Sequence, residues 1–245
     1  MDINVIIVII IIVIIAIIII VGAARLNLAN DLPANSEVAD PSNINTGDIL
    51  VVGYRNYRHW LTALWTGSVW SHTGIAWRHP VTGELFVLDS GRYKDDVTGL
   101  TSVNPVTPVT SVRRKLYDGI FRIPFDRWLH INRRQYIGHL KLRCSTTIDN
   151  KLVSAMDQVW ARLEKCSKDS NTRWVYNVCS SPYTKPLYKG KYICYELSVI
   201  LLQECGIMAK INHPSSYTPK ALAGRHIEMM AGYTYEDPVL LTISI

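Results

Sequence analysis

The sequence has no closely spaced cysteine pair and no concentrated run of basic residues, and both absences narrow its function. Its five cysteines include no Cys-x-x-Cys motif, which argues against a zinc ribbon and against a thioredoxin-type redox site. The formal net charge is +6, but the basic residues are scattered, with short pairs such as Arg133–Arg134. Nucleic-acid-binding domains usually gather such charge on one face, so we expect no nucleic-acid partner. No internal repeat is present, and 245 residues suit one mid-sized domain with an appendage.

Charged and polar side chains are also missing from the N-terminal segment between Val5 and Ala24. Because about 20 helical residues at ~1.5 Å rise cover the ~30 Å hydrocarbon core of a bilayer, this segment is long enough to span one. A cleaved signal peptide is the alternative, since small residues lie at the end of the segment. However, the apolar run is longer than a typical signal-peptide core, and no Lys or Arg precedes it. We therefore predict an uncleaved, single-pass anchor over residues 1–25, with the lipid bilayer as the partner of residues 5–24.

Two further parts are expected after the anchor. Residues 26–45 are rich in Asn, Asp, Ser and Pro and have little periodicity, which predicts a linker. The folded domain is then expected over residues 46–245. Asp2 precedes the apolar segment and Arg25 follows it, a small charge difference that favours the cytoplasmic side for the domain.

Short apolar strands and two amphipathic helices are predicted within the domain. The strands are expected at residues 49–52, 71–77, 84–90 and 119–123, with a turn that contains Pro and Gly at 78–83. Residues 98–110, rich in Pro and Thr, are predicted to be a loop. Apolar residues recur at helical spacing over Asn150–Lys165 and Ile193–Cys205, and Gly206 suits a C-terminal cap. Because strands and helices segregate, we predict an α+β fold with a small antiparallel sheet packed on helices.

Cys194 is the candidate nucleophile, because it lies at the start of the second predicted helix. Backbone N–H groups and the helix dipole at such a position favour a thiolate and help to stabilise an oxyanion. A nucleophilic cysteine also needs a base, and that base needs an orienting group. His72 is the candidate base, in a strand where Gly74 and Ala76 are small enough to leave room beside the ring.

Asp89 is the candidate orienting group, on the basis of a predicted hairpin. If the turn is centred between Pro80 and Val81, His72 lies directly opposite Asp89, and the two side chains share one face of the sheet. Asp89 would then hold the His72 tautomer and stabilise the imidazolium. A zinc site formed by the same three residues is an alternative, although no closely spaced pair of ligands supports it. We expect neither a metal nor another cofactor.

Other polar residues are weaker candidates. Glu196 could polarise the site, although capping or a surface position fits it better, and Tyr54 could donate a hydrogen bond to an oxyanion. His226, in a Gly-Arg-His stretch, is either a ligand or a surface residue. The remaining cysteines that we considered lack a comparably placed base and are predicted to be structural: Cys166, Cys179 and Cys205.

Four segments together resemble the permuted branch of the NlpC-type papain-like superfamily: TGDILVV, SHTGIAW, FVLDSG and YICYELSVILLQECGI. In that branch, bacterial YiiX-like proteins and a poxvirus relative share a Gly-Asp opening strand, a Ser-His-x-Gly strand and a late catalytic cysteine. Tyr217–Ala223 also resembles the closing Thr-Pro element of these proteins, so that the resemblance covers residues 46–223. It places the histidine of the family on His72, the cysteine on Cys194 and the acidic residue, usually Glu, on Asp89. The resemblance thus implies a circularly permuted papain-like fold.

The resemblance implies a cysteine hydrolase or acyltransferase that acts on amide, thioester or ester bonds. Lipid acyl groups are included, because some permuted relatives use them and the predicted anchor would hold the site beside a bilayer. The alternative is a structural membrane protein that retains the fold as a scaffold. The isoleucine-rich segment and the poxvirus-type relatives point to a virion or an internal viral membrane, with capsid or other membrane proteins as partners. The exposure and reactivity of the Cys194 thiol discriminate between the two hypotheses.

Overall fold

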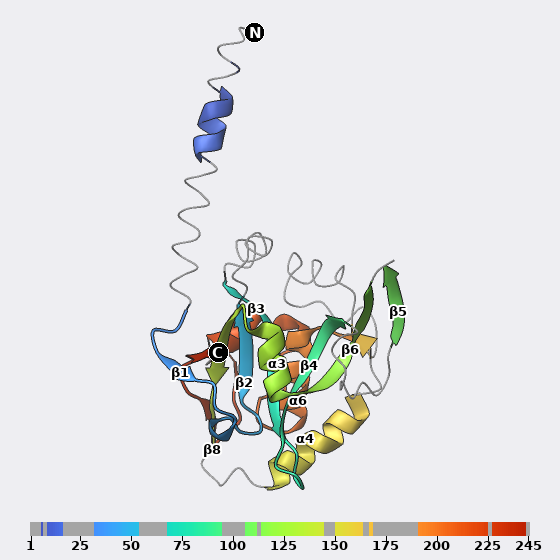
Figure 1. Ribbon diagram of the computed structural model, residues 1–245. Coiled ribbons are helices and arrows are strands. Elements are labelled where there is room, and N and C mark those ends of the chain that lie inside the picture. Colours follow the sequence, from blue (N-terminus) through green and yellow to red (C-terminus); the bar gives the residue numbers. More distant parts are fainter. Residues whose placement is uncertain are drawn as a thin grey trace.

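The computed structural model describes residues 6, 9–16, 32–53, 68–94, 106–111, 114–144, 150–163, 167–168, 191–224 and 227–243. Residues 9–16 are helical (Figure 1). Their isoleucine and valine side chains are exposed. Within the described ranges, no helix is both long enough and apolar enough to cross a membrane. The anchor over residues 5–24 stays a prediction, because about half of it lies outside those ranges.

An eight-stranded sheet lies at the centre of the domain, in the order β1-β12-β7-β2-β3-β4-β6-β5. Neighbouring strands are antiparallel except β1 and β12, which pair in parallel. The α+β prediction is confirmed, but the sheet is mixed and larger than expected. The strands of this sheet are β1 Ser36–Val38, β2 Ile49–Gly53, β3 Trp70–Arg78, β4 Leu85–Lys94, β5 Val106–Ser111, β6 Arg114–Pro124, β7 Tyr136–Leu140 and β12 Val239–Thr242. Two short pairs join β8 (Leu142–Cys144) to β11 (Tyr233–Tyr235) and β9 (Ser167–Lys168) to β10 (Lys191–Tyr192).

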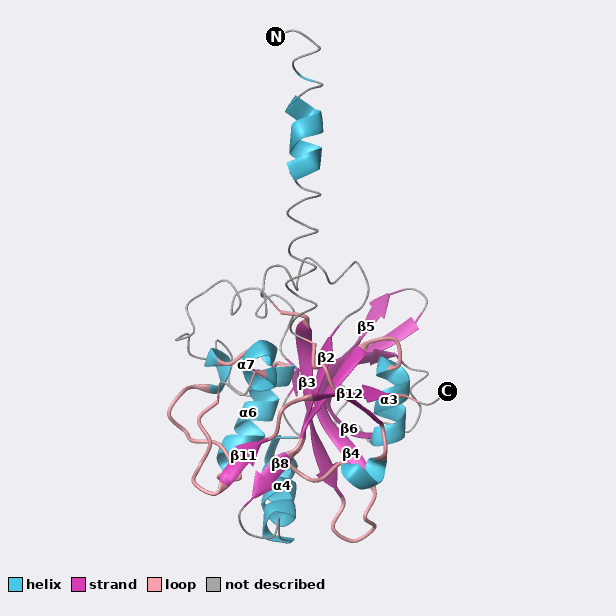
Figure 2. Ribbon diagram, turned by 90° about the vertical axis from the view of Figure 1, so that its left-hand side faces the viewer, coloured by secondary structure: helices cyan, strands magenta, loops and turns pink. Residues whose placement is uncertain are grey.

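Helices cover both faces of the sheet, so the domain has three layers (Figure 2). On one face lie α4 (Asn150–Leu163), α6 (Cys194–Glu204) and α7 (Pro219–Ala223), and on the other lies α3 (Phe125–Asn132). Short 3-10 turns at Pro41–Asn43 and Pro214–Ser216 complete the described elements. The predicted helices at 150–165 and 193–205 are therefore confirmed as α4 and α6, and Gly206 ends α6 with a positive φ of 70°.

Side chains alternate along the strands and divide the core into two clusters, one for each face. Ile75 and Trp77 on β3 pack in the cluster that contains residues of α4 and α6, whereas Ala76 packs in the cluster that contains α3. Leu88 and Val87 on β4 divide in the same way. Because residues two apart on a strand point to the same face, Gly74 and Ala76 of β3 and Val87 and Asp89 of β4 share the face that carries α3.

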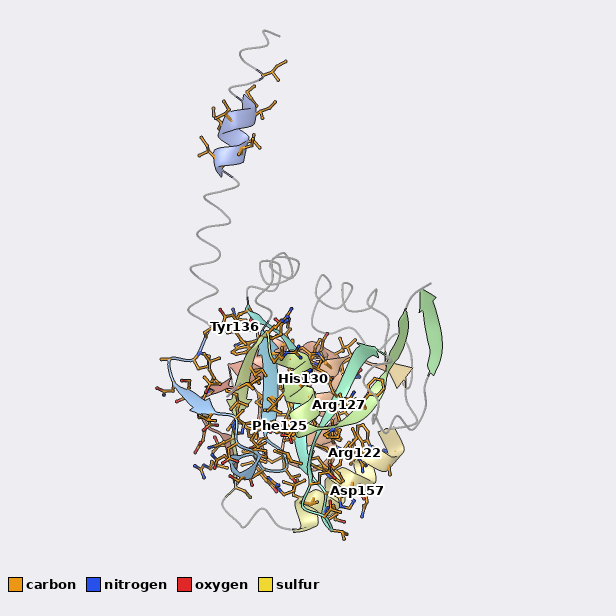
Figure 3. The ribbon with its side chains drawn as sticks, viewed as in Figure 1. Arg122, Phe125, Arg127, His130, Tyr136 and Asp157 are labelled. Atoms are coloured by element: carbon orange, nitrogen blue, oxygen red, sulfur yellow. The ribbon has the colours of Figure 1, made fainter. Side chains whose placement is uncertain are left out.

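A stacked arginine joins α4 to the sheet. The Arg122 guanidinium on β6 lies 4.2 Å from the Trp77 ring centroid and 5.5 Å from that of Trp160 on α4. Its Nη2 lies 3.5 Å from the Asp157 carboxylate on the same helix, and Figure 3 shows Arg122 and Asp157 side by side. This partly buried cation contacts both indoles and packs α4 against the face of the sheet that also carries α6.

Two predicted irregular segments contain strands and need correction. Ser36–Val38, within the predicted linker 26–45, pairs with β12 as β1. A three-residue edge strand is too short for periodicity, and its partner comes from the opposite end of the chain. Val106–Ser111, which overlaps the predicted loop 98–110, forms β5 at the other edge of the sheet. Its Pro108 is tolerated there because an edge strand with an irregular register does not need every backbone N–H.

Candidate active site

Cys194 is the first residue of α6, as the sequence predicted. The Ile193 N–H donates to the Glu196 carboxylate at 3.2 Å, so Glu196 caps the helix. Glu196 is buried, which excludes the surface position considered for it. The Ser198 hydroxyl lies 3.2 Å from the Cys194 carbonyl oxygen and 3.1 Å from the Thr73 hydroxyl on β3. These contacts fix the first turn of α6, and with it the nucleophile, against β3.

The pairing between β3 and β4 ends next to the candidate base. The pairing runs from Arg78 opposite Leu85 to Gly74 opposite Asp89, whereas β4 continues along β6. Beyond this point, the Thr73 backbone N–H donates a hydrogen bond to the Cys194 thiol. The thiol therefore lies at the end of the β3–β4 pairing, beside the His72 side chain.

His72 and Asp89 are in direct contact. The Nε2 atom of His72 lies 2.9 Å from both carboxylate oxygens of Asp89, and the His72 side chain is 15% exposed while that of Asp89 is 0% exposed. Trp128 on α3 donates its Nε1–H to the Oδ2 atom of Asp89 at 2.8 Å. The carboxylate is thus held both by the candidate base and by an indole from the neighbouring layer.

The predicted hairpin register is wrong by two residues, although the predicted contact is present. Gly74 lies opposite Asp89, and Trp77 lies opposite Phe86, so His72 does not face Asp89 directly. Because side chains alternate with a period of two, a shift of two residues leaves both side chains on the same face as diagonal neighbours. A shift of one residue would have placed them on opposite faces.

Gly74 provides space in the site, but not beside the imidazole as the sequence suggested. A Cβ atom at Gly74 would lie 2.5 Å from Cγ1 of Val87 and 4.0 Å from the Trp128 ring. The absent side chain therefore admits the neighbouring residue of β4 and the indole that contacts Asp89.

The charges of the three candidate residues favour an ion pair. Burial raises the pKa of the Cys194 thiol, but the charge of His72 and a hydrogen bond to its ring outweigh this effect, so that the pKa is lowered. Burial lowers the pKa of His72, but the charges of Asp89 and Cys194 outweigh it and hold the pKa well above its usual range. These opposite shifts favour a Cys194 thiolate beside a His72 imidazolium.

The structure therefore brings Cys194, His72 and Asp89 together, and their catalytic roles stay a prediction. No three His, Cys, Asp or Glu side chains in the described part of the chain are placed to hold a metal ion, so the zinc alternative gains no support. Cys205 lies at the other end of α6, where burial raises the pKa of its thiol to about 12, which agrees with a structural role. The other weaker candidates lie outside the described residues: Tyr54, Cys166, Cys179 and His226.

A second buried polar cluster surrounds Asp48, the acidic residue of the Gly-Asp motif. Its carboxylate accepts hydrogen bonds from the backbone N–H groups of Asn45 and Leu142, each at 2.8 Å. The Nε2 atom of His139 also lies 2.8 Å from this carboxylate, and its Nδ1 atom lies 2.8 Å from Glu37 on β1. The motif thus joins β1, β2 and β7, and no contact connects it with the thiol in the described residues.

Comparisons with known proteins add little to this geometry. No protein-family model matches the sequence, and no curated protein matches it. Among solved structures, the chain is similar to one described as metalloprotein yiiX from Escherichia coli O157:H7, with a TM-score of 0.42 and 12% sequence identity over 79% of this chain and 96% of that chain. This is a distant likeness of fold, and it says nothing about the reaction or its residues.

Proposed function

We propose that this protein is a membrane-anchored cysteine hydrolase or acyltransferase with a circularly permuted papain-like fold. The observation that carries the proposal is the contact of a helix-terminal thiol, Cys194, with a histidine that a buried carboxylate holds. The three side chains come from α6, β3 and β4, elements that meet only in the folded domain. Burial of so many ionisable groups is costly unless they pair, and their opposite pKa shifts are those that a nucleophile and its base need.

In the proposed reaction, the Cys194 thiolate attacks an acyl carbonyl and forms a tetrahedral intermediate. Backbone N–H groups in the first turn of α6 receive the negative charge on the oxygen. Since Asp89 contacts Nε2 of His72, the Nδ1–H of the imidazolium is left to protonate the leaving amine, alcohol or thiol. The acyl bond breaks and the acyl group stays on Cys194. His72 then takes a proton from water or an acceptor alcohol, which attacks the thioester and restores the thiolate.

The predicted anchor favours acyl groups at a membrane as substrates. β1 begins about a dozen residues after Ala24, and an extended chain of that length spans at most ~40 Å. A bilayer that holds residues 5–24 would therefore keep the domain close to its surface. This supports lipids, or acylated proteins in the same membrane, ahead of soluble peptides.

A structural role is the second candidate, and one observation favours it. Cys194 is only 7% exposed, whereas a working nucleophile must be reached by its substrate. In this alternative the protein is a virion or internal-membrane component that retains the hydrolase fold as a scaffold, with capsid or other membrane proteins as partners. The reactivity of the thiol separates the two functions.

The first experiment is iodoacetamide alkylation of the full chain in detergent as a function of pH, with the Cys194 peptide followed by mass spectrometry. We expect alkylation of Cys194 to be half-maximal at a pH below ~8.5, the pKa of a free cysteine thiol. In His72→Ala this midpoint should move upward by about one pH unit or more. Cys205 is an internal control, because its raised pKa of about 12 should keep it slow in both proteins. A slow Cys194 thiol that does not respond to the loss of His72 would instead support the scaffold.

A further inference from the structure

Asp89 receives a hydrogen bond from the layer of the domain that lies across the sheet from α6. Trp128 on α3 is 0% exposed, and its Nε1–H lies 2.8 Å from the Oδ2 atom of Asp89. The Asn132 side chain donates to the Trp128 carbonyl oxygen at 3.0 Å and ties the indole-bearing turn to the end of α3. Figure 2 shows α3 and α6 on opposite faces of the sheet, so the candidate site takes a contact from each layer.

An indole N–H suits this carboxylate better than a cationic donor would. A buried carboxylate stays charged only where hydrogen-bond donors replace the water that it has lost. A lysine or arginine in this place would also neutralise the negative charge of Asp89, so that the carboxylate would attract the His72 imidazolium less strongly. The indole is uncharged and only donates, so it stabilises the carboxylate and leaves its negative charge to the imidazolium.

The geometry also fixes the direction of the carboxylate. The Oδ2 atom accepts from both Nε1 of Trp128 and Nε2 of His72, at 2.8 and 2.9 Å. Two donors from different elements on one oxygen restrict rotation of the carboxylate about its side-chain bond. Asp89 therefore cannot turn away from His72 without losing its contact with Trp128.

We propose that Trp128 is a positioning residue: its indole N–H keeps the Asp89 carboxylate charged and directed at His72, and through His72 it sets the reactivity of the Cys194 thiol. This inference rests on the proposed function. It assigns to α3 a part in the chemistry that goes beyond covering the sheet.

Trp77 offers a matched control on the other face of the sheet. It is 1% exposed, and its Nε1 atom has no hydrogen-bond acceptor in the described part of the chain. Trp→Phe removes a similar buried ring area at either position. A hydrogen bond to a carboxylate is lost only at Trp128.

The test compares full-length Trp128→Phe and Trp77→Phe by the pH profile of Cys194 alkylation and by urea unfolding. Both variants should lose the packing of the removed ring, and Trp128→Phe should lose further stability because its hydrogen bond to Asp89 is also lost. In Trp128→Phe, alkylation near neutral pH should fall by roughly tenfold, the lower end of what a lost hydrogen bond to a charged group produces, because the effect reaches the thiol only through His72. The profile should move toward that of a free thiol. In Trp77→Phe the profile should keep its position.

A double-mutant cycle with Asp89→Asn tests whether Trp128 acts through Asp89. Without the carboxylate, Trp128→Phe should change alkylation by less than about twofold further. If Trp128→Phe shifts the profile no more than Trp77→Phe does, or if its effect adds in full to that of Asp89→Asn, the inference is wrong. If wild-type Cys194 already behaves as an ordinary thiol that is indifferent to His72, the proposed function fails instead.

Nuclear magnetic resonance gives a second measurement in case Trp128→Phe does not fold. The indole N–H resonance of Trp128 should lie downfield, as for a proton shared with a carboxylate, and Asp89→Asn should move it upfield. Alkylation of Cys194 should also move it, because the negative charge beside His72 is then lost. An indole resonance that neither change affects would overturn the inference.

Discussion

His139 and His72 both contact carboxylates, but they differ in how many ring nitrogens those carboxylates occupy. His139 is 0% exposed, and its two ring nitrogens contact Asp48 and Glu37. It therefore has no nitrogen left for a substrate. His72 uses only Nε2 for Asp89 and keeps its second nitrogen for the thiol of Cys194. The same residue type is thus structural in one place and suited to proton transfer in the other.

Loss of His139 should destabilise the domain in a pH-dependent way. We expect His139→Ala to lower the free energy of unfolding by roughly 3–5 kcal/mol, because the buried Asp48 carboxylate would lose its charged partner and keep only two backbone N–H donors. Burial lowers the pKa of His139, but hydrogen bonds and charges from Asp48 and Glu37 outweigh it, so that the pKa is raised above 6.5. The contribution is therefore complete below pH 6.5 and is lost as the pH rises through the folded pKa.

Urea unfolding of wild type and His139→Ala, from mildly acidic to alkaline pH, checks this prediction. The difference in free energy should shrink toward alkaline pH. It should also shrink in acid. Burial raises the pKa of Glu37, but the contacts with His139 and Lys141 together outweigh it, so that the pKa is lowered. The contribution of Glu37 is then lost as the pH falls through that lowered pKa. A difference that stays constant over the whole range would contradict the ion-pair interpretation.

At this scale, the sequence predicted the residues that carry recognisable chemistry and missed those that only hold them. Cys194, His72 and Asp89 were predicted to meet because nucleophile, base and carboxylate occur in patterns with a chemical meaning, and the structure brings them together while their roles stay a prediction. Trp128 was not predicted, because a tryptophan in a short segment indicates only a buried core residue. Its hydrogen bond to Asp89 depends on the packing of α3 against the sheet. Glu37 was missed for a related reason, since its partner lies about a hundred residues away in the chain.

The elements at the site meet because the β3–β4 pairing ends early. β4 continues along β6 beyond Asp89, whereas β3 presents the Thr73 N–H to the first residue of α6. This arrangement needs the two strands to be close at Gly74, where a Cβ atom would meet Val87. Beyond Gly74 the two strands no longer pair, and the Cys194 thiol lies beside β3 at this point.

Gly74→Ala should therefore disturb both stability and the site. We expect a loss of roughly 1–3 kcal/mol, because the new Cβ would lie 2.5 Å from Cγ1 of Val87 and must displace it. The same displacement should slow Cys194 alkylation, since Asp89 lies directly opposite Gly74. Urea unfolding and alkylation rates measure the two effects.

A second substitution shows whether this contact is the cause. Val87→Ala removes the atom that the new methyl group would meet, at the expense of a small cavity. The double variant should then be less destabilised than the sum of the two single variants. Simple additivity would mean that Gly74 is needed for another reason.

At the scale of elements, the long and periodic segments were predicted and the short ones were not. β2, β3 and β4 were found as apolar runs next to turn residues, and α4 and α6 were found because apolar residues recur at helical spacing. α3, β7 and β12 are short, and their packing depends on partners distant in the chain. The two-residue error in the hairpin arose because the turn residues indicate where a turn lies but not its length.

The two ends of the domain meet at one edge of the sheet. β1 pairs with β12 over three residues, and the Thr242 hydroxyl donates to the Glu37 carbonyl oxygen at 3.0 Å. Since Arg78 also donates to the carbonyl oxygens of Pro41 and Ile44, a shortened chain should begin before β1 and not at the predicted boundary, Thr46.

The N-terminal segment should hold the whole molecule in a membrane. Ile12 is 60% exposed in the helix at residues 9–16, and most of its apolar neighbours there are about half exposed. Exposed apolar surface costs about 25 cal/mol per Å² in water, so lipid is the favourable environment for this helix.

The full chain should stay in the membrane pellet after alkaline carbonate extraction, and a chain that begins at residue 32 should stay in the supernatant. Aspartate at both Ile12 and Val13 should release the full chain, since each charge costs roughly 2.5–3.5 kcal/mol at the centre of a membrane helix. The intact mass of the extracted protein separates an anchor from a signal peptide, because cleavage near Ala24 would remove the whole apolar segment. A full-length chain found in the supernatant, or a mass that lacks these residues, would refute the membrane anchor and leave the geometry of Cys194, His72 and Asp89 to be tested on a domain in solution.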